Sequence, residues 1–240
     1  MEQFLYGILG VYFLLGGVLI ALVNRKKDAT FRKTSWVKYF VYLVLINALF
    51  IAILWNKQYF HYAGLVIMAF GLYEILRNMF SSGKYPTGLI SLLIFSLLVF
   101  TFYQFTLLDR PWLFYTLFLT TVFDAFSQLS GQLFGNRKIL PGISPNKTLE
   151  GTIGGVLFAV ATSVMIRGLI ETTLAGAIFL SLGLAAAAFF GDLLASLAKR
   201  KFGIKDFSQL IPGHGGFLDR FDSFLVTGSF VYIYFSLSIS

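Results

Sequence analysis

The sequence lacks cysteine altogether and contains only two histidines in 240 residues. Without cysteine there can be no disulfide bond, no thiol nucleophile and no cysteine-ligated zinc site, and two histidines are too few for a histidine-rich metal centre. Charged residues are also scarce, at 12% of the chain, where a soluble domain has about 25%. So few charges cannot cover the surface of a soluble globule. The composition therefore excludes thiol chemistry and argues against a soluble protein.

Hydrophobic residues are abundant, at 57% of the chain, and they predict an all-α, polytopic membrane helix bundle. About eight apolar segments approach the roughly 20 residues that a helix needs to cross a bilayer. They lie near residues 3–23, 36–55, 60–78, 87–108, 112–134, 150–170, 173–198 and 217–238. We expect four N-terminal membrane helices in 1–110 and a catalytic region with four more in 111–240. The long polar connections are expected at 24–35, 135–149 and 199–216.

The distribution of basic residues predicts how these helices are oriented. The net charge is +8, and most basic residues gather in alternate loops, which marks those loops as cytoplasmic. Both termini are then expected outside, with the active site on the cytoplasmic side of the inner membrane. In a membrane protein this charge indicates attraction to anionic lipid rather than binding of nucleic acid. The first apolar run is too long for a signal peptide, so we expect it to be a membrane helix.

One stretch, Ser196–Asp222, concentrates nine ionisable groups in 27 residues between two apolar segments. Its carboxylates Asp219 and Asp222 stand three residues apart on one face at the start of the last helix. Asp192 lies in the preceding helix, about two turns before the Lys199–Arg200 pair. We therefore expect the three carboxylates to converge from two adjacent helix ends.

Two further acids lie inside expected membrane helices, where a carboxylate is costly and by default marks a functional site. Asp124 lies in the fifth helix, and we expect it to belong to the site. Glu74 lies near the end of the third, and we interpret it as a satisfied residue at the membrane interface.

The residue types in this region suit the chemistry of phosphates. Carboxylates are the oxygen ligands that Mg²⁺ prefers, and lysine and arginine bind phosphate groups. The glycine-rich turn at 212–216 offers backbone N–H groups that can approach an anion closely. Together these features predict phosphoryl or nucleotidyl transfer.

The stretch resembles the signature of the phosphatidate cytidylyltransferases, also called CDP-diacylglycerol synthases. The matching residues are Ser196, Lys199, Arg200, Lys205, Asp206, Pro212, His214, Gly215, Gly216, Asp219, Arg220 and Asp222. A second block after Asp124 is similar to another element of that family, with Ser144, Pro145, Lys147, Thr148, Glu150 and Gly151. The resemblance is specific over about 120–225. The chain departs from many bacterial members at Ala195 and Ala198, where they have glutamate and a larger apolar residue.

The resemblance implies that CTP and phosphatidate react to give CDP-diacylglycerol and pyrophosphate. It implies Mg²⁺ held by Asp192 and Asp219 with help from Asp222, and a second cation such as K⁺. The expected catalytic residues are Asp192, Asp219, Lys199, Arg200, Lys205, Arg220 and His214. The expected substrate-binding residues are Ser144, Asn146, Lys147, Thr148, Asp124, Asp206, Gly215 and Gly216. CTP, phosphatidate and membrane lipid are the expected partners, nucleic acid is not, and a homodimer is left open.

Three alternatives stay open at this point. A CTP-dependent kinase of polyprenol or another lipid alcohol would release CDP instead of pyrophosphate. An ion-coupled transporter would also place acids such as Asp124 and Asp192 within the membrane, although a cluster of bases and glycines does not suit a cation pathway. A catalytically silent relative would be expected to lack the matching acids.

Overall fold

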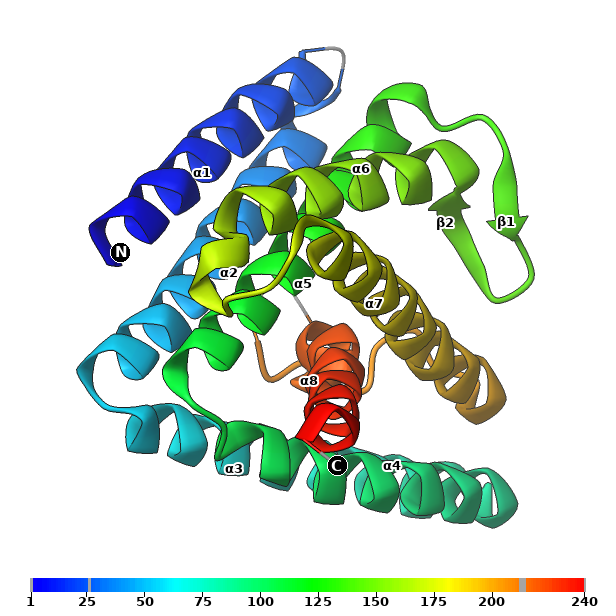
Figure 1. Cartoon of the computed structure of the whole chain (residues 1–240). Helices are drawn as coiled ribbons and strands as arrows, with labels where there is room; N and C mark the ends of the chain where they lie inside the picture. The colour runs from blue at the N-terminus through cyan, green and yellow to red at the C-terminus, as the bar shows by residue number, and fades with distance from the viewer. Residues whose placement is uncertain (1, 26, 212–214, 240) are drawn as a thin grey trace.

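The chain folds into eight long helices and one small hairpin (Figure 1), in a computed structural model that describes residues 2–25, 27–211 and 215–239. The helices are α1 (Glu2–Asn24), α2 (Ala29–Trp55), α3 (Lys57–Ser82), α4 (Tyr85–Thr106), α5 (Arg110–Phe134), α6 (Leu149–Ile166), α7 (Leu174–Phe202) and α8 (Leu218–Ile239). A short 3₁₀ helix, η1 (Arg167–Leu169), follows α6. The hairpin pairs β1 (Lys138–Leu140) antiparallel with β2 (Ser144–Thr148). The helical bundle is confirmed, whereas the hairpin inside the loop 135–149 was not predicted.

Six of the described helices are long and apolar enough to cross a membrane, so the chain is a multi-pass membrane protein. The two long helices outside this set are α5 and α8, which turn polar side chains toward other helices. Thr120 of α5 and Thr227 of α8, for example, are both buried and share a hydrogen bond of 2.9 Å between their hydroxyls. Such polar contacts hold helices together within a bilayer. The predicted number of eight crossings stays a prediction.

Two of the helix boundaries that differ from the prediction are explained by a capping residue. α2 begins seven residues before the expected position 36, because the Asp28 carboxylate caps it by accepting a hydrogen bond of 2.6 Å from the N–H of Phe31. α7 continues past 198 to Phe202 and stops at Gly203, which has a left-handed φ of 76°. Lys199 and Arg200 therefore belong to the last turn of a helix rather than to a loop.

The last helix, α8, contacts α3, α4, α5 and α7 and lies between α7 and α4 in Figure 1. Its Phe224 packs edge-on against Phe60, Phe102 and Phe105 of α3 and α4, with ring centroids 5.4 to 6.2 Å apart. This aromatic cluster joins the first half of the chain to the last helix. It therefore fixes the position of the acids at the beginning of α8.

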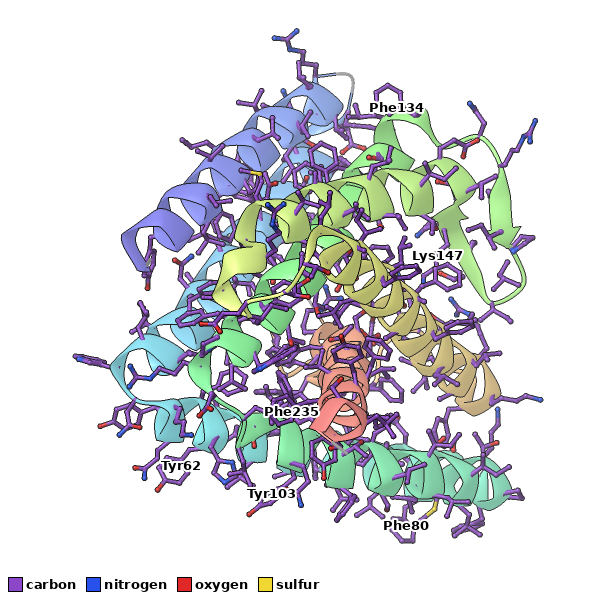
Figure 2. All side chains as sticks on the ribbon, viewed as in Figure 1. Tyr62, Phe80, Tyr103, Phe134, Lys147 and Phe235 are labelled. Atoms are coloured by element: carbon purple, nitrogen blue, oxygen red, sulfur yellow. The ribbon has the colours of Figure 1, made fainter. Side chains whose placement is uncertain are left out.

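Aromatic side chains also cover the outside of the bundle. Figure 2 shows Tyr62, Phe80, Tyr103 and Phe134 at the margin of the molecule, and all four are exposed. So much apolar surface turned outward is unsuited to water but suited to lipid.

Candidate active site

The hairpin reaches across to α7 through Lys147 of β2 (Figure 2). Its ammonium nitrogen lies 3.0 Å from the carboxylate of Asp192 and donates a hydrogen bond of 3.1 Å to the carbonyl of Phe189. The same nitrogen stands 4.2 Å from the centre of the Phe189 ring, which adds a cation–π contact. The block after Asp124 thus meets α7, the helix that leads into the charged stretch Ser196–Asp222.

Asp124, Asp192 and Asp222 form what we call the acidic group. They come from α5, α7 and α8, three helices in mutual contact. The three side chains lie close enough to influence one another electrostatically. A Cβ atom added to Gly191 would stand 2.7 Å from the carbonyl oxygen of Asp222, so the glycine allows α7 and α8 to approach closely here. That approach brings Asp192 beside Asp222.

Asp219 is buried and has its own set of direct partners. Its Oδ1 lies 2.7 Å from the ammonium of Lys199, and its side chain is only 1% exposed. Its Oδ2 accepts hydrogen bonds from the N–H groups of Phe207 at 2.7 Å and Gly216 at 2.9 Å. The carboxylate is therefore fully engaged with groups of the protein itself. Buried ion pairs of this kind require such additional hydrogen bonds.

The described backbone N–H groups before α8 do not face an open anion site. Gly215 has a left-handed φ of 85° and lies against Asp219 and Asp206. The N–H of Gly216 donates to Asp219, and those of the next two residues donate to Glu74. The predicted donor Gly216 and the two N–H groups after it thus bind carboxylates of the chain. Pro212 and His214 lie outside the described residues.

The basic side chains around the site have different surroundings. Arg200 donates from Nε to the carbonyl of Ile143 at 3.1 Å, which ties the end of α7 to the hairpin. The Nε of Arg220 is buried and has no partner among the described residues. Arg220 also lines a cavity of about 20 Å³ together with Asp124 and Tyr42. The side chain of Lys205 is exposed.

The other predicted residues of the second block mainly build the hairpin. Thr148 caps α6 by accepting a hydrogen bond of 3.2 Å from the N–H of Gly151. Glu150 accepts one of 3.0 Å from the N–H of Asn136, which closes the base of the hairpin. Two more predicted residues lie on β2: Ser144, partly buried, and Asn146, exposed. Lys147 alone among these side chains is seen to reach α7 in the described contacts.

The predicted metal ligands differ in how well they fit a cation. Within the described ranges, no group of three or more His, Cys, Asp or Glu side chains is arranged to hold a metal ion. Asp219 does not fit as a ligand here, because its two oxygens are engaged by Lys199 and by backbone N–H groups. Asp192 fits better, because its side chain is 40% exposed, although its oxygens contact the hydroxyl of Ser196 and the ammonium of Lys147. Asp222 lies near it and offers a second carboxylate, the kind of hard oxygen ligand that Mg²⁺ prefers. Their role in metal binding stays a prediction.

Glu74 is the residue whose surroundings differ most from expectation. Its hydrogen-bonding capacity is satisfied, as predicted, and it is 0% exposed, so it lies inside the bundle rather than on its surface. Its carboxylate accepts hydrogen bonds from Ser208 and from the N–H groups at the start of α8. The signal in the sequence was an acid within a membrane helix, but its partners are 134 or more residues away along the chain.

Comparison with known proteins gives consistent matches over most of the chain. A model of the cytidylyltransferase family matches residues 4–238, which include both the hairpin and the start of α8. A phosphatidate cytidylyltransferase of Staphylococcus epidermidis is 30% identical over 228 residues, covering 90% of this chain and 86% of that protein. One of Rickettsia conorii is 35% identical over 195 residues, covering 77% and 84%. One of Haemophilus influenzae is 42% identical over 130 residues, covering 51% and 45%.

Proposed function

The chain belongs to the cytidylyltransferase family, and on that premise we propose that it transfers the cytidylyl group of CTP to phosphatidate. The products are CDP-diacylglycerol and pyrophosphate, which makes the protein a nucleotidyltransferase of phospholipid biosynthesis. The observation that carries the proposal is the contact between Lys147 of the hairpin and Asp192 of α7 at 3.0 Å. It joins the hairpin to α7, the helix that leads into Ser196–Asp222, so that a base and an acid stand side by side.

The reaction needs positioning and charge neutralisation more than proton transfer. An oxygen of the phosphatidate phosphate attacks the α-phosphorus of CTP, and the bond from that phosphorus to the β-phosphate oxygen breaks. A phosphate monoester is already an anion at neutral pH, so no strong general base is required. Basic side chains hold the two anionic reactants together and stabilise the charge on the leaving pyrophosphate. Lys147, which contacts Asp192, and Arg220, which lines a cavity with Asp124, are the bases that we propose for this work. Arg200, which holds the hairpin through Ile143, is proposed to act beside them.

Asp192 and Asp222 are the residues that we propose to hold Mg²⁺. When bound, the ion supplies positive charge beside the phosphates. Asp219 contributes differently, because it holds the ammonium of Lys199 at 2.7 Å and so orients this base. A second cation such as K⁺ stays a prediction.

An apolar cavity beside the acidic group supports a lipid as the acceptor. It has a volume of about 90 Å³ and lies among α3, α4, α7 and α8, with Asp222 on its wall. Ala195 and Ala198 line it, and their small side chains leave room that larger residues would fill. An acyl chain in this cavity would place the attached phosphate near Asp222. We propose that the site opens to the inner leaflet on the cytoplasmic side, with both termini outside.

The decisive experiment follows the leaving group. Purified protein in detergent is given phosphatidate, CTP and Mg²⁺, and pyrophosphate and CDP are measured separately. We expect pyrophosphate together with CDP-diacylglycerol, and loss of both with Asp192→Asn. CDP with a phosphorylated lipid alcohol would instead indicate a lipid kinase. A folded wild-type protein that releases neither nucleotide product would contradict the proposal.

A further inference from the structure

A carboxylate from the first half of the chain is buried beneath the start of α8. Glu74 of α3 is 0% exposed. Its Oε1 accepts hydrogen bonds from the hydroxyl of Ser208 at 2.5 Å and the N–H of Phe217 at 2.9 Å. Its Oε2 accepts one from the N–H of Leu218 at 2.9 Å. In the described part of the chain, no lysine or arginine forms an ion pair with it.

The N-terminus of α8 explains why a carboxylate is stable at this position. The first N–H groups of a helix have no partner within the helix, and the aligned peptide dipoles give that end a partial positive charge. Leu218 is the first residue of α8, and Phe217 directly precedes it. Glu74 accepts from both N–H groups and thus caps the helix from another part of the chain. This helix end binds a carboxylate of the protein instead of a phosphate of the substrate.

A second residue of α3 extends the same contact. Asn78 stands one turn after Glu74 on the same helix face and donates a hydrogen bond of 2.8 Å to the carbonyl of Phe207. The N–H of Phe207 in turn donates to Asp219 at 2.7 Å. Nearby, the rings of Phe70 and Phe217 stack at 4.4 Å. α3 therefore holds two segments that precede Asp219, one at Phe207 and one at the start of α8.

The glycine at position 216 is explained by this arrangement. A Cβ atom at Gly216 would overlap the carboxylate of Glu74, so a side chain there would push the two segments apart. The close approach of Glu74 thus requires glycine at this point of the motif, independently of any substrate. The same glycine donates its N–H to Asp219 at 2.9 Å, so both carboxylates meet at one backbone segment.

From these contacts we propose that Glu74 is a positioning residue for the reaction, because it fixes the start of α8 and with it Asp219 and Asp222. Asp219 directly follows the capped residue Leu218, and Asp222 lies one turn further on. Lys199 is held by Asp219 at 2.7 Å, so its place depends on the same helix end. Glu74 acts through these residues and touches no reacting atom. Its effect on catalysis rests on the proposed function, whereas its effect on the loop does not.

The variant Glu74→Gln tests the proposal, because it keeps the size of the side chain but replaces one acceptor oxygen with an N–H donor. We expect amide hydrogen exchange in the peptide spanning 207–220 to become about tenfold faster, since two capping bonds are weakened. We expect kcat to fall about tenfold or more. A substitution far from the reacting atoms that displaces a catalytic group by about 1 Å can lower the rate about 100-fold. The KM for CTP should change by less than about threefold, since the lost interaction is not a contact with substrate. Glu171→Gln, the same change at an exposed residue, is the matched control. It should leave the exchange rate, kcat and the KM for CTP unchanged.

Ser208→Ala provides a milder variant in case Glu74→Gln does not insert or fold. It removes one donor to Glu74 and leaves the carboxylate, so we expect a smaller change of the same kind. Unchanged exchange at 207–220 in the folded variant would overturn the proposal. Faster exchange with an unchanged kcat would also overturn it, because Glu74 would then be structural only. Absence of product from the wild-type protein would contradict the proposed function instead, and the exchange data would still decide whether Glu74 fixes the loop.

Discussion

Lys199 and Asp219 form a buried ion pair that joins the last turn of α7 to the first turn of α8, with 2.7 Å between Nζ and Oδ1. The two side chains are 14% and 1% exposed. By contrast, the pair formed by Lys147 and Asp192 is partly open, since the Asp192 side chain is 40% exposed. The two pairs are therefore expected to respond differently to substitution.

Removal of the buried carboxylate should destabilise the protein as well as inactivate it. Asp219→Ala leaves the ammonium of Lys199 without its partner, which typically costs about 3–5 kcal/mol. Asp192→Ala should abolish activity with a stability change of about 1 kcal/mol or less, because exposed pairs contribute little. Thermal unfolding in detergent and product formation measure the two effects. Equal stability of both variants would contradict the distinction.

Lys147 should matter for activity but not for folding. Lys147→Met removes the base that links the hairpin to the acidic group, and we expect activity to fall about 100-fold, as when one stabilising donor is lost. The control is Lys138→Met, which removes an exposed lysine from the other strand of the same hairpin. Steady-state release of pyrophosphate compares the two. Similar activities in both variants would remove Lys147 from the site.

The dependence of activity on Mg²⁺ should distinguish Asp192 and Asp222, the proposed ligands, from Asp219. Chelation with EDTA should abolish product formation, and added Mg²⁺ should restore it. Asp192→Asn and Asp222→Asn should raise the Mg²⁺ concentration for half-maximal activity by about tenfold or more, as lost ligand interactions do. Asp219→Asn should lower the maximal rate without such a shift, since this carboxylate faces Lys199. A shift as large in Asp219→Asn would show that the acid leaves Lys199 to bind the metal.

Filling the apolar cavity should affect the lipid substrate alone. Ala198→Phe places a ring in the space beside Asp222, and we expect the KM for long-chain phosphatidate to rise about tenfold, as for a misfit of a few methylene groups. The KM for CTP should stay unchanged. Leu182→Phe, on an exposed part of the same helix, is the control. Equal effects on both substrates would indicate general disruption of α7 rather than a lipid site.

The helix bundle and the region of the site could be predicted from the sequence for physical reasons. Backbone polar groups must be satisfied within the chain in a bilayer, so long apolar runs predict helices with little ambiguity. The concentration of charge in Ser196–Asp222 marks the site because charges in such a chain are costly. The predicted start of α2 and the predicted end of α7 differ from the structure. Asp28 and Gly203 cap these helices at points that hydrophobicity does not reveal.

The sequence by itself determined the helical architecture, the set of charged residues and the family signature. Tertiary structure decided how those residues are grouped: Asp124 with Asp192 and Asp222, Asp219 with Lys199, and Glu74 with the start of α8. The reason is that spacing along one helix follows from its 3.6-residue turn, so the sequence shows that Asp219 and Asp222 stand about one turn apart but not which partners each one meets. Distances between helices depend instead on which faces pack together, and the partners of Glu74 lie more than a hundred residues away along the chain.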